Sequence, residues 1–142
     1  DRDEPLIVHF RECFRYIDLC RDIFEKNSAE FPTCLVHCDQ GVSRSATVVI
    51  AYLIRTYRLS LRCAYEHVFS RRECIAPNTG FFEQLQEFAR GDDSMSAEMY
   101  TQFTRLAEER RRARWADLLQ PKHSLPEETG IPAAAVHSSN EA

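Results

Sequence analysis

Residues 33–54 read TCLVHCDQGVSRSATVVIAYLI, and this stretch decides the predicted fold. Residues 33–36 are too few for a helix and predict a short, buried strand. Residues 37–45 place a cysteine, a glycine and an arginine in the order of a tight loop. Residues 46–57 are apolar on nearly every side, which predicts a central, buried helix. Strand, cysteine loop and buried helix are therefore expected to follow one another directly.

The loop has the composition of an anion-binding cradle. Backbone N–H groups that converge just before a helix N-terminus bind anions such as phosphate. Gly41 allows a tight bend and a close approach to the anion, and Arg44 can grip two phosphate oxygens with its planar guanidinium. The remaining phosphate-binding donors are expected to be backbone N–H groups of Asp39, Gln40, Gly41, Val42 and Ser43.

Cys38 would lie at the bottom of this cradle. A helix N-terminus, inward N–H groups and a nearby guanidinium favour the thiolate, so its pKa should lie well below about 8.5. Ser45 can donate its hydroxyl to the same sulfur and ease its departure in a second step. His37 is expected to shape the loop by hydrogen bonding, because a thiolate needs no base. The pattern predicts phosphoryl transfer onto Cys38.

Other interpretations of the loop fit less well. A buried cysteine beside a chance glycine turn does not explain why all these features occur together between a strand and a buried helix. A nucleotide P-loop requires a Lys-Ser/Thr pair after the glycine, which Gly41 lacks. In a cysteine protease, the histidine would not adjoin Cys38, where neighbouring side chains diverge. A zinc site is disfavoured because the chain has no CxxC pair.

The composition is that of a soluble globular domain. The chain has 142 residues, 44% hydrophobic and 28% charged, with a formal net charge of −4. This balance does not predict a nucleic-acid partner, and the nearly apolar run over 46–54 is shorter than the roughly 20 residues of a membrane span. The six cysteines are irregularly spaced and expected to be free thiols. We therefore expect a reducing compartment, the cytoplasm and also the nucleus, with no membrane association.

Apolar residues three or four apart predict further helices over 6–24, 61–71 and 81–89. Turns are predicted at Asn27–Pro32 and Pro77–Gly80. Because one strand cannot form a sheet, we expect an α/β domain whose central sheet is flanked by helices and whose N-terminal strands are missing from this chain.

The chain changes character after residue 94. Residues 94–119 predict an additional charged amphipathic helix, which is either solvated or a surface for a protein partner. Residues 120–142 contain three prolines and no Phe, Tyr or Trp, which predicts a disordered tail. The domain that contains the cysteine loop is therefore expected to span 1–91.

Residues 36–54, VHCDQGVSRSATVVIAYLI, resemble the signature of the dual-specificity phosphatases in the protein tyrosine phosphatase superfamily. Residues 9–18, HFRECFRYID, and residues 75–88 are also similar to that family. The resemblance covers about residues 1–90, which would be the C-terminal part of a catalytic domain.

The resemblance implies hydrolysis of phosphotyrosine and phosphoserine/threonine in phosphoprotein substrates, with a phosphocysteine intermediate and no metal or other cofactor. Cys38 would be the nucleophile and Arg44 would stabilise the transferring group. Asn78 matches the asparagine that braces the loop by hydrogen bonding. The general acid would be an aspartate just before the first helix, with Asp1 the nearest candidate and Asp3 the next.

Two alternatives to an active enzyme remain open at this point. The first is a catalytically weak or inactive phosphatase that only binds phosphopeptides through the cradle. The second is an interaction protein that uses the 94–119 helix and carries the phosphatase domain. An intact Cys38 and Arg44 favour the enzyme, because a binding module could dispense with the thiol.

Overall fold

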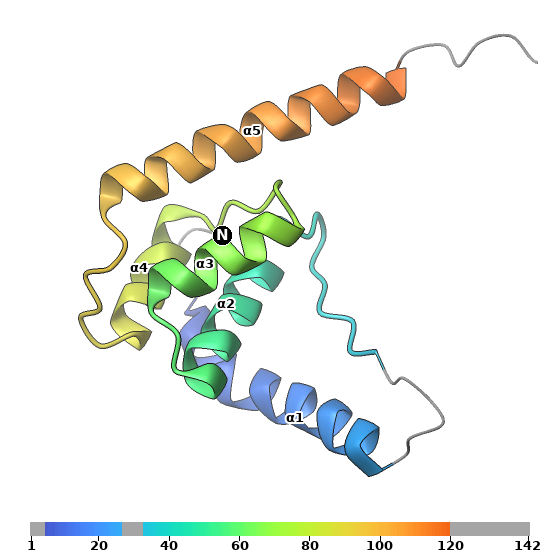
Figure 1. Ribbon diagram of the computed structural model, residues 1–142, viewed down its shortest axis with the longest axis vertical. Coiled ribbons are helices and arrows are strands. Elements are labelled where there is room, and N and C mark those ends of the chain that lie inside the picture. The colour runs from blue at the N-terminus through green and yellow to red at the C-terminus, as the bar shows by residue number, and fades with distance from the viewer. Residues whose placement is uncertain (1–4, 27–32, 120–142) are drawn as a thin grey trace, which may run out of the picture.

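The structure is a computed structural model of the 142-residue chain, and it describes residues 5–26 and 33–119. A short 3₁₀ helix, η1 (Leu6–His9), leads directly into the first α-helix. The α-helices are α1 (Phe10–Lys26), α2 (Arg44–Tyr57), α3 (Leu61–Arg71), α4 (Thr79–Phe88) and α5 (Ala97–Leu119), as Figure 1 shows. The predicted helices on both sides of the cysteine loop are thereby confirmed.

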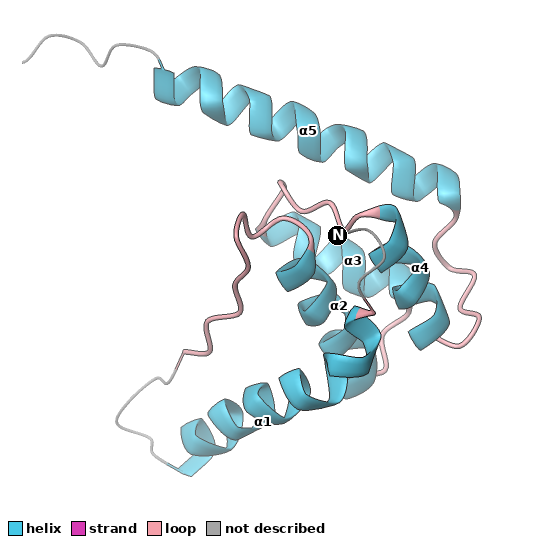
Figure 2. Ribbon diagram, turned by 180° about the vertical axis from the view of Figure 1, so that it is seen from behind, coloured by secondary structure: helices cyan, strands magenta, loops and turns pink. Residues whose placement is uncertain are grey.

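Helix α2 is the centre of the molecule, in contact with α1, α3 and α4 (Figures 1 and 2). The side chains of Ile50 and Ala51 are fully buried, and Val48 and Tyr52 are nearly so. Apolar side chains on most sides of this helix allow it to pack against several neighbours at once. The N-terminus of α2, where the cysteine loop ends, is therefore anchored in the core.

An aromatic cluster and an ion pair join α1 to this central helix. The ring of Phe14 lies 5.8 Å from that of Tyr52 and 5.9 Å from that of Phe88 in edge-on arrangements. The Tyr52 hydroxyl donates to the Asp18 carboxylate at 2.9 Å, and Arg55 donates to the same carboxylate at 3.0 Å. These contacts fix α1 along one side of α2.

The first half of α5 packs on α3 and α4. The ring of Tyr100 stacks on that of Phe82, with centroids 4.2 Å apart and planes 12° apart. The ring of Phe103 lies 5.1 Å from that of Tyr65 and 4.9 Å from that of Phe69. Figure 1 shows that the helix then continues past α3, on the side of the molecule away from α1. The N-terminal half of α5 thus belongs to the same core as the other helices.

The predicted α/β fold with a central sheet is wrong for the described structure, which is all-α. Residues 33–36 run extended into the loop, but no strand occurs anywhere in residues 5–26 and 33–119. Leu35, expected in a sheet centre, is 80% exposed, and only Val36 packs against the core. A strand exists only when a neighbour pairs its backbone groups, and the described part of the chain supplies none.

Some predictions fall on residues that the structure does not describe. The turn at Asn27–Pro32 and the tail at 120–142 lie outside the described ranges, as does the predicted boundary at Asp1. Among the helices that are described, none is both long enough and apolar enough to cross a lipid bilayer.

Candidate active site

The cysteine loop bends between an extended segment and the first turn of α2. Its sharpest point is Gly41, whose backbone φ of +65° is in the left-handed region that favours glycine. A Cβ atom at this position would lie 2.9 Å from the Arg72 guanidinium, which is too close for a normal contact. The bend therefore favours glycine through its positive φ, whereas the Arg72 guanidinium, at the end of a flexible side chain, could shift to admit a Cβ.

Cys38 is half-buried inside this bend, with its Sγ 3.3 Å from the Ser45 Oγ. Burial alone would raise the pKa of the thiol. Hydrogen bonds from the Ser45 hydroxyl and from the backbone N–H groups of Ser45, Gly41 and Gln40 outweigh that effect and lower the pKa from 9.0 to about 6. The thiolate is therefore the main form at neutral pH.

The Arg44 guanidinium is held at the edge of the loop by an acidic neighbour. Its Nη2 donates to Asp39 Oδ2 at 2.6 Å, and the Asp39 side chain is 85% exposed. An exposed ion pair of this kind is weak, worth roughly 0.2–1 kcal/mol. Arg44 could therefore exchange this carboxylate for a phosphate at little cost.

Arg72, which follows α3, clamps the outer side of the loop. Its Nε donates to the Gly41 carbonyl oxygen at 2.8 Å, and its Nη2 lies 3.4 Å from the Gln40 carbonyl oxygen. The bond to the Gly41 carbonyl turns that peptide group's oxygen toward Arg72. Sequence reasoning missed Arg72, because its partners are backbone atoms about thirty residues away.

Two further bonds tie the loop to the segment after α3. The Ala76 N–H donates to the Val42 carbonyl at 2.9 Å, and the Asn78 N–H donates to the Ser43 Oγ at 3.0 Å. The Asn78 side chain instead accepts from the Phe81 N–H at 2.9 Å and caps α4. Asn78 thus lies next to the loop, but the contact in the structure comes from its backbone. The Ala76 contact left no signal in the sequence, because any residue except proline has this N–H.

We name the residues from Arg72 to Asn78 the brace segment. It begins at the clamp on Gly41, passes the bond to Val42 and ends at the bond to Ser43. Each of these contacts ends on a loop residue between Gln40 and Ser43. The brace segment therefore helps to position the loop.

Two other residues were predicted to belong to the site, His37 and Asp1. His37 precedes Cys38 with an exposed side chain, and Asp1 lies outside the described residues. Within the described ranges, no three His, Cys, Asp or Glu side chains gather as a set that could hold a metal ion. The roles assigned to these residues stay predictions.

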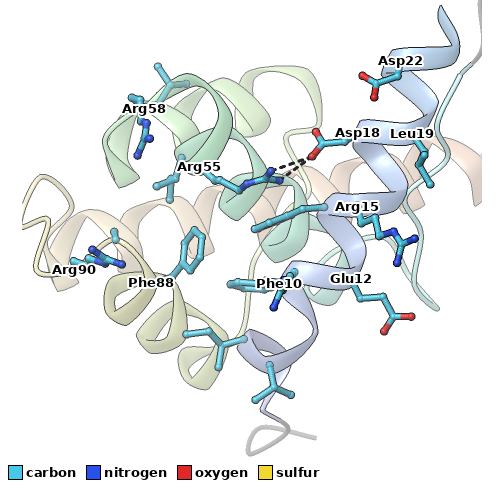
Figure 3. Close-up of a pocket in the computed structure, with 17 residues that line it drawn as sticks. Phe10, Glu12, Arg15, Asp18, Leu19, Asp22, Arg55, Arg58, Phe88 and Arg90 are labelled. Atoms are coloured by element: carbon cyan, nitrogen blue, oxygen red, sulfur yellow. Dashed lines mark hydrogen bonds and ion pairs between the residues drawn. The ribbon is translucent and has the colours of Figure 1, made fainter.

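A broad, open groove of about 1490 Å³ lies elsewhere, between α1 and the C-terminal ends of α2 and α4 (Figure 3). Its walls carry several arginines and the ion pair of Asp18 with Arg55. None of residues 37–45 lines it. The chemistry of the cysteine loop is therefore separate from this groove.

Comparison with known proteins places the loop in a family. Residues 2–91 match the family described as "Dual specificity phosphatase, catalytic domain". The chain is 41% identical over 95 residues to "Protein phosphatase Slingshot" of Drosophila melanogaster, which covers 67% of the chain and 8% of that protein. It is 42% identical over 89 residues to "Dual specificity protein phosphatase 22-B" of Danio rerio, a match that covers 63% of the chain and 45% of that protein.

A viral relative shows higher identity over a shorter stretch. The chain is 55% identical over 56 residues to "Putative tyrosine phosphatase 123R" of Invertebrate iridescent virus 6, which covers 39% of each chain. The chain thus spans less than half the length of each of these three relatives. The family match nevertheless covers more than half of the chain and includes the whole cysteine loop. The chain belongs to the dual specificity phosphatase catalytic-domain family.

Proposed function

We propose that this protein hydrolyses phosphotyrosine and phosphoserine/threonine in phosphoproteins through a phosphocysteine on Cys38. The observation that carries the proposal is the half-buried Cys38 sulfur, whose pKa is lowered to about 6 by the Ser45 hydroxyl and three backbone N–H groups. A structural cysteine has no need of such donors, whereas a nucleophile at neutral pH does. Family membership supports the same reading.

In the first step, the Cys38 thiolate attacks phosphorus, the bond from phosphorus to the ester oxygen breaks, and the phosphoryl group moves to sulfur. Arg44 leaves Asp39 and grips two of the three equatorial oxygens, while loop N–H groups bind the third and share the other two. The leaving oxygen takes a proton from a carboxylic acid. We expect Asp1 in that role on the family resemblance alone.

In the second step, water attacks the phosphorus of the phosphocysteine and the bond from phosphorus to sulfur breaks. The carboxylate left by the first step takes the proton of the water, and phosphate leaves with the thiolate restored. The Ser45 hydroxyl, 3.3 Å from Sγ, stabilises the departing thiolate by hydrogen bonding. Neither step uses a metal or another cofactor.

The test is the turnover of an aryl phosphate by the wild-type chain and by Cys38→Ser. We expect the variant to lose turnover while still binding tungstate, because the cradle donors remain. Cys63→Ser is the matched control: Cys63 is an exposed thiol on α3, and its loss should leave turnover unchanged. Turnover that survives in Cys38→Ser would contradict the proposal. Tungstate binding without any turnover in the wild type would favour the phosphopeptide-binding alternative.

A further inference from the structure

Helix α5 lies beyond residue 91, where the family match ends. It nevertheless contacts the brace segment, which supports the cysteine loop. Figures 1 and 2 show α5 passing over the connection between α3 and α4. That connection contains the brace segment. Helix α5 is therefore placed where its side chains can reach the segment that supports the cysteine loop.

Two side chains of α5 donate to backbone carbonyls of the brace segment. The Tyr100 hydroxyl donates to the Pro77 carbonyl at 2.8 Å, and an Arg111 guanidinium nitrogen donates to the Cys74 carbonyl at 3.1 Å. In addition, the Arg110 guanidinium lies 3.4 Å from the Glu73 carboxylate, with both side chains more than half exposed. The two hydrogen bonds to carbonyls restrain the backbone of the brace segment, whereas the exposed ion pair joins only two side chains.

Along the brace segment, the residues whose carbonyls are held by α5 alternate with the residues that contact the cysteine loop. Cys74 lies between Arg72, which clamps the Gly41 carbonyl, and Ala76, which donates to Val42. Pro77 lies directly between Ala76 and Asn78, which donates to Ser43. A shift of either carbonyl would therefore move one or more of the three contacts behind the loop.

The Tyr100 donor is held by the core. The Tyr100 ring stacks on Phe82 at 4.2 Å, so its hydroxyl has little freedom to move away from Pro77. Farther along α5, the Phe103 ring packs between Tyr65 and Phe69, which fixes the helix one turn later. The connection from the core through α5 to the brace segment is thus continuous.

We propose that Tyr100 and Arg111 are positioning residues that hold the brace segment and thereby keep the N–H groups of the cysteine loop directed at Cys38. Without these bonds the brace segment relaxes, the loop N–H groups turn from the sulfur, and the thiolate loses part of its stabilisation. The proposal deepens the proposed phosphatase function and rests on it for turnover. Its effect on the thiol can be measured without any turnover.

The experiment measures the rate of alkylation of Cys38 by iodoacetamide as a function of pH, with peptide mass spectrometry to separate Cys38 from the other cysteines. The variants are Tyr100→Phe, which keeps the stacked ring, and Arg111→Met, which keeps an unbranched stem. The matched controls are Tyr16→Phe on α1 and Arg112→Met on α5, both at exposed side chains.

We expect each variant to raise the pKa of Cys38, and the controls to leave it unchanged. A pKa of about 7 instead of about 6 would lower the alkylation rate at about pH 6 roughly fivefold. A lower melting temperature with an unchanged pKa in both variants would show that α5 only stabilises the fold, and would overturn the proposal. If the wild type lacks turnover but the variants shift the pKa, the positioning role holds and the proposed phosphatase function fails.

Discussion

At the scale of single residues, Cys38 is subject to opposing effects on its thiolate. Burial disfavours the charge, while the Ser45 hydroxyl and three backbone N–H groups favour it, and the result is a pKa of about 6. Four donors around one sulfur explain why the second effect prevails. The side-chain donor can be removed by mutation, whereas the backbone donors cannot.

Ser45→Ala should therefore raise the pKa of Cys38 only part of the way toward 9.0, because the three backbone donors remain. We expect alkylation of Cys38 near pH 6 to slow by roughly three- to tenfold, with a pH midpoint above that of the wild type. The wild-type rate should rise from pH 5 to 7, since the thiolate forms as the pH passes about 6. An unchanged midpoint in the variant would show that the hydroxyl does not bind the sulfur.

Asp39 competes with an incoming anion for Arg44, and its own charge repels that anion. Asp39→Asn should therefore tighten tungstate binding by about 1.4- to fivefold, which corresponds to the roughly 0.2–1 kcal/mol of an exposed ion pair. Asp93→Asn, an exposed carboxylate between α4 and α5, is the control for the change in net charge. Weaker binding in Asp39→Asn would mean that Asp39 prepares Arg44 for the anion.

The sequence could single out the central residues of the candidate site because they are neighbours in the chain. Cys38, Gly41 and Ser45 fall within eight positions, so the loop that connects them also brings them together. Arg72 and Ala76 could not be found this way. Their contacts to backbone atoms depend on how α3 packs, which no local pattern specifies.

At the scale of elements, Asn78 has two roles at the start of α4, one for its side chain and one for its backbone. Its side chain caps the helix through the Phe81 N–H, and its backbone N–H reaches Ser43. Asn78→Ala should lower the free energy of unfolding by about 1 kcal/mol, because only the cap is lost. The pKa of Cys38 should stay the same, since alanine keeps the N–H. A shifted pKa would show instead that the side chain braces the loop.

Helix α3 contains a buried hydroxyl with no hydrogen-bond partner among the described residues, that of Tyr65. Burial, with a smaller contribution from Tyr100, raises the pKa of this phenol. Tyr65→Phe removes the unpaired group and keeps the ring against Phe103. We expect the free energy of unfolding to rise by about 1 kcal/mol in chemical denaturation. A clear decrease would reveal a partner for the hydroxyl.

The helices were predictable because their apolar residues recur with the helical period. Residues 33–36 were not, because an apolar run is also compatible with an extended segment that has no sheet. A helix satisfies its own backbone, whereas a strand depends on a neighbour that the local pattern does not reveal. The exposure of Leu35 shows where that prediction failed.

At the scale of the whole molecule, the cysteine loop is supported from two directions. Helix α2 anchors its end in the core, and the brace segment holds its outer side, with α5 behind that segment. The matched family segment contains the loop and the brace, and α5 adds to it. The assembly leaves the Cys38 sulfur, inside the bend, as the centre of the proposed chemistry.

The most direct test of this account is to trap the proposed intermediate. The wild-type chain is mixed with an aryl phosphate whose phenolate leaves without an acid, quenched rapidly with acid, and digested for peptide mass spectrometry. The account predicts one added phosphoryl group on the peptide that contains Cys38, absent from Cys38→Ser. Turnover without phosphate on Cys38, or with phosphate on a different residue, would contradict it.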